Sequence, residues 1–181
     1  MTCIIGLVHD NKVYIGADSA AVSGWQVRAT RLDKVFRRGQ FLIAYTDSFR
    51  MGQILQYHLD VQPQDGETDI EYMVRHFVDA VRACFKELGF AKVENNEESG
   101  GLFLVGYRKH LYAIENDFQV NEMADGFDAW GCGNKYALGA MKALEHLPPI
   151  ERIGKALEIS THFSGGVLPP FQIEVLDDTE S

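Results

Sequence analysis

The stretch Thr2–Ala20, TCIIGLVHDNKVYIGADSA, contains two short apolar runs that are typical of β-strands, Cys3–Val8 and Val13–Ala17. The polar residues His9–Lys12 separate these runs, and their central Asp-Asn pair suits a tight turn between antiparallel strands. The sequence therefore predicts that the chain begins with a β-hairpin, and the remaining elements are predicted outward from it.

Thr2 stands directly before the first predicted strand, and two interpretations of it are open. Removal of Met1 would give Thr2 a free α-amine next to its own hydroxyl, so that one residue would hold both a base and a nucleophile. Alternatively, Thr2 is the ordinary first residue of an edge strand, because threonine is common in strands. By itself, Thr2 favours the second interpretation.

The first half of the chain continues with strands and then changes to a helical period. After the polar segment Ser19–Asp33, two further strands are predicted around a turn at Arg38–Gln40. Ser48 is a suitable N-cap for a helix that ends before Pro63. A long amphipathic helix follows, with Asp69 as its cap, and then a loop with an acidic stretch that we interpret as a solvated turn. The predicted ranges are strands Lys34–Arg37 and Phe41–Thr46, helix Ile70–Leu88, loop Gly89–Gly100 and acidic stretch Glu94–Glu98.

The second half repeats the order of strands followed by helices. The predicted strands are Leu102–Tyr107, His110–Glu115, Asp117–Val120, Ala129–Gly131 and, at the end, Phe171–Leu176. The predicted helices, Asn134–Leu147 and Ile150–Phe163, are separated by Pro148-Pro149. This order predicts an α+β fold, a four-layer αββα sandwich in which two antiparallel sheets pack together and a helix pair covers each outer face. At 181 residues we expect a single domain, residues 1–181.

Composition limits the classes of partner. The formal net charge is −9 and there is no basic stretch, so we expect neither nucleic acid nor an anionic membrane as a partner. No apolar run is long enough to span a bilayer, and the short run Cys3–Val8 has no basic leader typical of a signal peptide. Cys3, Cys84 and Cys132 lack paired spacing, which favours a reducing compartment, the cytoplasm. The six histidines show no metal-ligand spacing, so we expect no metal and no cofactor.

Three polar residues and two glycine-rich segments carry a resemblance to a known family. Asp18 follows Thr2 by sixteen positions, and Lys34 follows Asp18 by sixteen. Gly131–Ala140, GCGNKYALGA, opens a predicted helix, and Ser164–Gly166 follows the last one. Together these features resemble proteasome β-subunits and the related bacterial protease that works with an ATP-driven unfoldase. In that family, mature chains begin at a catalytic threonine followed by aspartate and lysine at the same spacings.

The resemblance implies a threonine-type N-terminal nucleophile peptidase that hydrolyses peptide bonds after removal of Met1. Thr2, Asp18 and Lys34 would be its catalytic residues. A lysine ammonium beside the threonine would favour the deprotonated hydroxyl and amine, and the aspartate would hold the lysine charged and oriented. The resemblance also implies peptide or unfolded-protein substrates, a homo-oligomeric ring and an ATP-dependent unfoldase as a partner.

Five further residues are expected to support the site, and three of them depart from the family pattern. Backbone N–H groups around Cys132 and Gly133, ahead of a helix, are suited to hold a developing oxyanion. Cys132 replaces a serine and brings only a weak thiol. Tyr45 replaces a glycine whose N–H faces the scissile carbonyl, and we expect its bulk to narrow the cleft while its N–H stays a donor. Thr161 replaces an aspartate that precedes the closing serine, Ser164.

These departures leave two alternatives to a peptidase. The first is a catalytically silent, proteasome-like subunit that acts as a scaffold. The second is an amidohydrolase of the same fold that acts on a small amide. All three hypotheses predict the same fold, and they differ in whether Thr2 reacts and with what.

Overall fold

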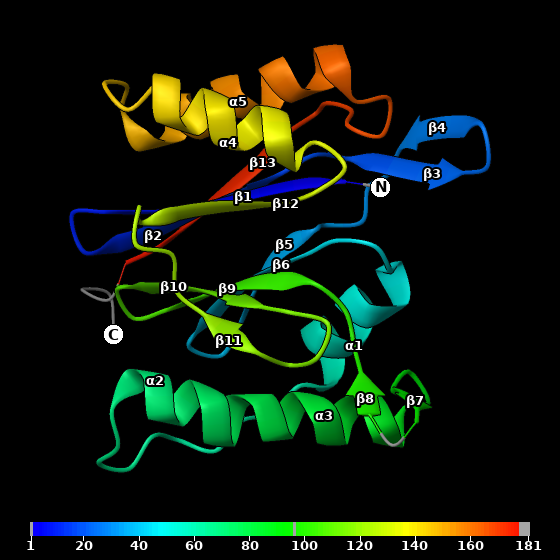
Figure 1. Cartoon of the computed structure of the whole chain (residues 1–181), viewed down its shortest axis with the longest axis vertical. Coiled ribbons are helices and arrows are strands. Elements are labelled where there is room, and N and C mark those ends of the chain that lie inside the picture. Colours follow the sequence, from blue (N-terminus) through cyan, green and yellow to red (C-terminus); the bar gives the residue numbers. More distant parts are fainter. Residues whose placement is uncertain (1, 96, 178–181) are drawn as a thin grey trace.

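The computed structural model describes residues 2–95 and 97–177, and Figure 1 shows four layers stacked along the long axis of the molecule. Two sheets lie in the middle, and helices cover the outer face of each. The first sheet has the strand order β12-β1-β2-β13, and the second has the order β11-β10-β9-β6-β5. All pairings within both sheets are antiparallel. The predicted α+β sandwich is therefore confirmed.

The strands of the two sheets fall close to their predicted ranges. Those of the first sheet are β1 (Cys3–His9), β2 (Lys12–Ala17), β12 (Phe127–Gly131) and β13 (Gln172–Leu176). Those of the second sheet are β5 (Val35–Arg38), β6 (Phe41–Tyr45), β9 (Phe103–Tyr107), β10 (His110–Ile114) and β11 (Val120–Asn121). The predicted opening hairpin is present, with Val8 opposite Val13. The strand predicted at Asp117–Val120 begins later, because Phe118 takes a positive φ of 67° in a turn.

The helices form one group on each side. On the second sheet lie α1 (Phe49–His58) and a continuous helical segment made of α2 (Asp69–Tyr72), the π-helical turn η1 (Met73–Phe77) and α3 (Val78–Glu87). On the first sheet lie α4 (Asn134–Ala143) and α5 (Pro149–Phe163). Ser48 caps α1 as predicted. Thr68, instead of Asp69, caps α2, because the Thr68 side chain accepts from the Glu71 backbone and Glu71 bonds back in a capping box.

Two short hairpins lie where the sequence predicts only loops. They are β3 (Ala20–Ser23) with β4 (Gln26–Ala29), and β7 (Lys92–Glu94) with β8 (Glu97–Ser99). Neither belongs to the main sheets. Every residue of β4 and β7 is exposed, so these strands lack the apolar alternation by which strands are recognised in a sequence.

The core is divided into three layers by the alternation of side chains along the strands. Ile4 and Leu42 point into the space between the sheets, together with Val13, Ile15, Val35 and Leu104. Their neighbours Ile5 and Ile43 point outward, the first toward α4 and α5 and the second toward α1 and the α2–α3 segment. Because both faces of each sheet are buried, the central strands are apolar throughout.

The described residues contain no helix both long and apolar enough to cross a membrane. In residues 2–95 and 97–177 no group of three or more His, Cys, Asp or Glu side chains is arranged to hold a metal ion.

Candidate active site

Lys34 is the centre of a buried polar cluster at one end of the two sheets. It lies directly before β5 and is 2% exposed. Its ammonium donates to Thr2 Oγ1 at 2.9 Å, to Asp18 Oδ1 at 2.9 Å and to the carbonyl of Ala20 at 2.7 Å. A lysine ammonium has three N–H donors, so the three contacts use all of them and fix the position of the nitrogen.

Asp18 lies directly after β2 and holds the cluster together. Its Oδ1 accepts from the Cys3 backbone at 2.9 Å, in addition to Lys34. Its Oδ2 accepts from the backbone N–H groups of Ala20 at 2.7 Å and Leu168 at 3.2 Å. The carboxylate therefore ties three separate segments of backbone to the lysine.

The fold explains why residues sixteen positions apart meet here. The register of the opening hairpin pairs Ile4 with Ala17, which brings the preceding Thr2 and the following Asp18 to the same end of the first sheet. Lys34 belongs to the second sheet. Its neighbour Val35 is buried with Ile4 and Ala17 between the sheets, so the packing of the two sheets delivers the lysine to this end.

Burial changes the acid-base properties of the cluster. Loss of solvent lowers the pKa of Lys34 below its ordinary value, and the adjacent Asp18 carboxylate opposes this change. Burial also raises the pKa of Cys3 to about 12, so its thiol stays protonated near neutral pH. The Thr2 hydroxyl is therefore the group beside the cation that is suited to nucleophilic attack.

The Gly131–Gly133 turn lies against Thr2. Gly131 has a φ of +97°, and a Cβ there would lie 2.1 Å from the Thr2 carbonyl oxygen, so glycine is required. The N–H of Gly133 donates to the same Thr2 oxygen at 3.4 Å. This N–H therefore contacts Thr2 in this structure, and its expected role as an oxyanion donor stays a prediction. Cys132 Sγ accepts from Ser164 Oγ at 3.1 Å, which links the turn to the end of α5.

Tyr45 lies beside the cluster. Its backbone N–H donates to the carbonyl of Lys34, the residue before β5, at 3.1 Å, so this donor has a partner within the chain. Tyr45 and Thr2 line a small cavity of ≈60 Å³ together with Val22, Lys34, Asp47 and Phe49. The expected roles of Tyr45 in the cleft stay predictions. Burial raises the pKa of the Tyr45 hydroxyl to about 12, so the ring stays neutral.

Thr161 lies on α5, and its hydroxyl donates to the Glu158 carbonyl within the same helix at 2.7 Å. The structure therefore does not bring this hydroxyl into the Thr2–Asp18–Lys34 cluster. Sequence reasoning missed Ser160, the buried residue before it. Ser160 Oγ donates to the Ala156 and Gly133 carbonyls and lies 3.9 Å from Cys3 Sγ. A serine among apolar positions of a predicted helix is the signal that could have identified it.

Val22, Asp47 and Phe49 also line the cavity beside Thr2 and were not predicted. Val22 lies on the missed strand β3. Asp47 has a backbone φ of +68°, which residues other than glycine rarely adopt. It lies directly before Ser48, the N-cap of α1. The Asp47-Ser48 pair, between a predicted strand and a predicted helix, was the signal in the sequence that could have identified Asp47 as a lining residue.

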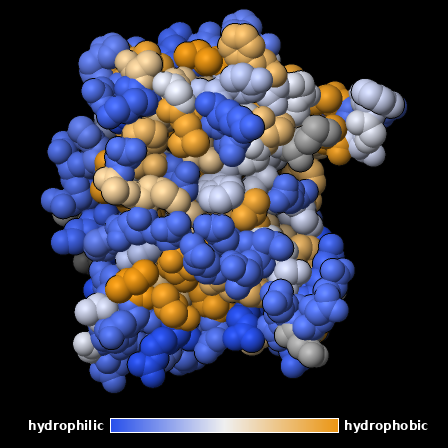
Figure 2. All heavy atoms as spheres, viewed as in Figure 1, coloured by the Kyte–Doolittle hydropathy of each residue, from blue (hydrophilic) through white to orange (hydrophobic). Residues whose placement is uncertain are grey.

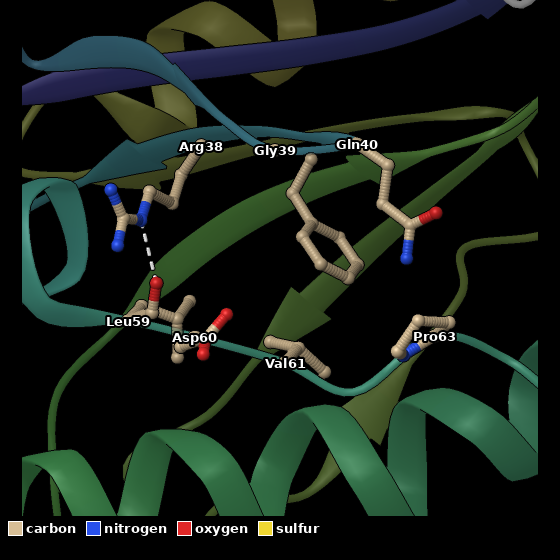
Figure 3. Close-up of a pocket in the computed structure, with 8 residues that line it drawn as sticks. Arg38, Gly39, Gln40, Leu59, Asp60, Val61 and Pro63 are labelled. Atoms are coloured by element: carbon tan, nitrogen blue, oxygen red, sulfur yellow. Dashed lines mark hydrogen bonds between the residues drawn. The ribbon is translucent and has the colours of Figure 1, made fainter.

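A larger cavity of ≈390 Å³ lies elsewhere, between the β5–β6 turn and the segment that follows α1 (Figure 3). Arg38 Nε donates to the Leu59 carbonyl across it at 2.6 Å. None of the residues that line it lines the Thr2 cavity. This contact attaches the chain after α1 to the sheet.

Two antiparallel sheets packed face to face between helix layers, with Thr2 directly before the first strand, form the fold that the resemblance in the sequence implies. Solved structures with this fold match the chain over nearly its whole length. Thiobacillus denitrificans BPH has a TM-score of 0.82 and 21% identity, and its complex with epoxomicin has a TM-score of 0.79 and 21% identity. Each match covers 97% of this chain and 98% of the other.

The eukaryotic HslV from Trypanosoma brucei matches with a TM-score of 0.67 and 20% identity, over 96% of this chain and 98% of that one. No protein-family model matches the sequence, and a search of curated proteins finds no match. At these identities the similarity shows the fold, which agrees with the resemblance seen in the sequence.

Proposed function

We propose that this chain is a threonine-type N-terminal nucleophile peptidase and that Thr2 is its nucleophile. The observation that carries the proposal is the 2.9 Å contact between the Lys34 ammonium and Thr2 Oγ1, inside a cluster in which Thr2 is only 4% exposed. An ordinary threonine–lysine pair is exposed to solvent, whereas this pair is buried. Placing a cation against a hydroxyl away from solvent strengthens its effect on that hydroxyl.

The proposed reaction needs a free α-amine on Thr2, and Met1 lies outside the described residues. With Met1 removed, Thr2 Oγ1 attacks the carbonyl carbon of a peptide bond while the α-amine takes the hydroxyl proton. The C–N bond then breaks, the amine returns the proton to the leaving nitrogen, and an ester joins the substrate to Thr2. A water molecule attacks that ester, the same amine moves the water proton to Oγ1, and the acid product leaves.

Lys34 and Asp18 have separate roles in this proposal. The ammonium stabilises negative charge on Thr2 Oγ1 during attack, because it is already oriented at 2.9 Å and does not need to reorganise. The Asp18 carboxylate opposes the loss of the lysine proton that burial favours. Asp18 is thus a positioning residue, which holds Lys34 charged and in place.

The small cavity beside Thr2 suggests a preference for small substrate side chains next to the cleaved bond. Tyr45 limits this space, and its ring is itself held in place. A Cβ on Gly52 of α1 would lie 2.2 Å from the ring carbons, so the ring packs directly on the helix backbone. A peptide library cleaved mainly after large side chains would contradict this preference.

The proposal extends to the oligomeric state, the compartment and the partner of the chain. We propose that the chain forms a homo-oligomeric ring in the cytoplasm, with Thr2 facing unfolded-protein or peptide substrates that an ATP-dependent unfoldase supplies. The resemblance carried by Thr2, Asp18 and Lys34 supports this, because it implies such an assembly, and the fold shared with HslV and BPH agrees with the resemblance.

One observation favours the alternative of a silent scaffold. The N–H groups of Tyr45 and Gly133, expected to bind an oxyanion, are both occupied by backbone carbonyls. If the Cys132 N–H does not hold the oxyanion either, the chain would bind the fold's partners without cleaving peptides. This alternative predicts that Thr2→Ala changes no activity and no cellular phenotype.

The intact mass of the purified protein, with and without epoxomicin, tests the proposed function. We expect a protein that lacks Met1 and gains the mass of one epoxomicin molecule. Thr2→Ala is expected to abolish the adduct, and Thr161→Ala is the matched control that keeps it, because its hydroxyl contacts only its own helix. Retention of Met1 together with no adduct would overturn the proposal and favour the scaffold.

A further inference from the structure

The β3–β4 hairpin carries an aromatic residue whose side chain the described residues leave fully exposed. Trp25 lies in the turn, after Gly24 with its φ of +56°, and is fully exposed at 104%. Figure 1 shows the hairpin projecting beyond the sheets and helices. A tryptophan in this position exposes a large apolar area to water, and tryptophan is enriched at the energetic centres of protein interfaces.

The same hairpin is basic in an otherwise acidic chain. Arg28 on β4 and Arg31 just after it are both exposed. Arg28 is 3.4 Å from the side-chain oxygen of Gln26, and no ion pair involves either arginine among the described residues. The chain as a whole has a formal net charge of −9. The hairpin therefore presents an aromatic tip beside two available positive charges.

A groove of ≈810 Å³ lies in another part of the molecule, between α3 and the β7–β8 hairpin. Its apolar lining is Val74, Val78 and Phe118, of which Val74 is 50% exposed and the other two are buried. Figure 2 shows hydrophobic surface over the α2–α3 segment, with hydrophilic residues on the β7–β8 side. The groove is large enough for an indole ring and the turn that carries it.

The rim of this groove is strongly acidic. Asp79, Glu94, Glu97, Glu98 and Asp117 line it, against a single cation, Arg82. Arg82 is already paired, with Asp79 at 3.2 Å and Glu98 at 2.8 Å. No ion pair within the described residues involves the remaining three carboxylates. They are available to face positive charges from a partner.

We propose that the β3–β4 hairpin of one copy docks into the α3–β7–β8 groove of a second copy of this chain. Trp25 covers the apolar lining, and Arg28 and Arg31 face Glu94 and Glu97. The partner is a second copy because this chain supplies both halves of the match, an aromatic basic projection and an apolar acidic recess. The surfaces are unlike, so each copy both gives a hairpin and receives one.

This inference deepens the proposed homo-oligomeric assembly and rests on it, while the peptidase chemistry has its own measurement, the epoxomicin adduct. The two can therefore fail separately. Loss of the epoxomicin adduct concerns Thr2, whereas the experiments below measure the mass of the assembly and are carried out equally well on Thr2→Ala protein.

Sedimentation velocity over a range of protein concentrations measures the contact. We expect the unaltered chain to associate and Trp25→Ala to raise the dissociation constant by about 30-fold or more, the effect of a central interface residue. Tyr57→Ala is the matched control, because Tyr57 is an exposed aromatic residue at 66% that lies on neither surface. A monomeric unaltered chain, or equal effects of the two variants, would overturn the proposal.

Charge reversal identifies the two surfaces that meet. Arg28→Glu with Arg31→Glu reverses the charge of the two hairpin positions, and Glu94→Lys with Glu97→Lys reverses the charge of the two groove positions that face them. Each variant alone is expected to stay monomeric, because like charges would then face each other at these positions. Mixed together they are expected to associate, since opposite charges then meet at the paired positions of each contact. Failure of the mixture to associate would refute the pairing, even if each variant alone is monomeric through another cause.

Discussion

Lys34 and Trp25 lie only nine positions apart in the sequence, yet they occupy opposite environments. Lys34 is 2% exposed and each of its N–H donors is used, whereas Trp25 is fully exposed. A charged group is in the interior and an aromatic group is in water, the reverse of the usual preference. Burying the lysine costs free energy that its contacts must offset, which points to reaction chemistry, whereas exposing the tryptophan leaves apolar area available for association.

The largest expected effect on stability comes from substitution of Lys34, the buried residue of this comparison. Lys34→Met removes the cation and leaves the Asp18 carboxylate buried without it, which we expect to cost about 3–5 kcal/mol of the free energy of unfolding. Urea denaturation of the Thr2→Ala and Thr2→Ala/Lys34→Met proteins measures it. Adding Asp18→Asn should recover part of the loss. Lys155→Met, on the surface of α5, is the control and should leave the midpoint unchanged.

A smaller effect is expected at the turn that supports Thr2. Gly131→Ala places a Cβ against the Thr2 carbonyl in a backbone conformation with φ of +97°, which we expect to cost about 1–3 kcal/mol. Gly139→Ala on α4 is the control, because a Cβ there meets nothing within 4 Å and alanine favours helix. Thermal unfolding of both variants measures the difference. Equal melting temperatures would show that the turn does not constrain Thr2.

The pH dependence of stability tests the effect of burial on Lys34. Because the pKa of Lys34 is lowered on folding, the unfolded chain binds more protons than the folded chain at pH values between the lowered pKa and 10.5. Stability contributed by this residue therefore rises with pH in that window, by at most about 1.4 kcal/mol per pH unit. Urea unfolding of unaltered and Lys34→Met proteins across alkaline pH measures it. We expect the free energy of unfolding of the unaltered protein, minus that of Lys34→Met, to rise with pH. A fall of this quantity with increasing pH would contradict the lowered pKa of Lys34.

The smallest effect is expected on the exposed side. At protein concentrations too low for association, Trp25→Ser should change the free energy of unfolding by less than about 0.5 kcal/mol, since its side chain is fully exposed. At high concentration the unaltered chain should become more stable than the variant, because association stabilises the folded state. Chemical denaturation at two concentrations separates these contributions. A large loss at low concentration would show that Trp25 supports its own chain.

The sequence predicted those parts of the fold whose signal is local. The hairpin at Cys3–Ala17 and the strands at Phe41 and Leu102 are apolar runs bounded by turn residues, and their side chains are buried. The β3–β4 and β7–β8 hairpins were missed because their strands are exposed and carry no periodic pattern. The cap at Thr68 was missed in favour of the adjacent Asp69, although the spacing to Glu71 is that of a capping box.

The candidate site divides in the same way. The sequence by itself predicted Thr2, Asp18 and Lys34 as one site through spacings that resemble the family, and the hairpin register explains how Asp18 returns to Thr2. Only the tertiary structure decided that Lys34 reaches them, since the lysine arrives from the other sheet through packing of side chains far apart in the chain. The same holds for the N–H groups of Tyr45 and Gly133. A backbone donor looks free in a sequence, and its partner is known only once the sheets and turns are in place.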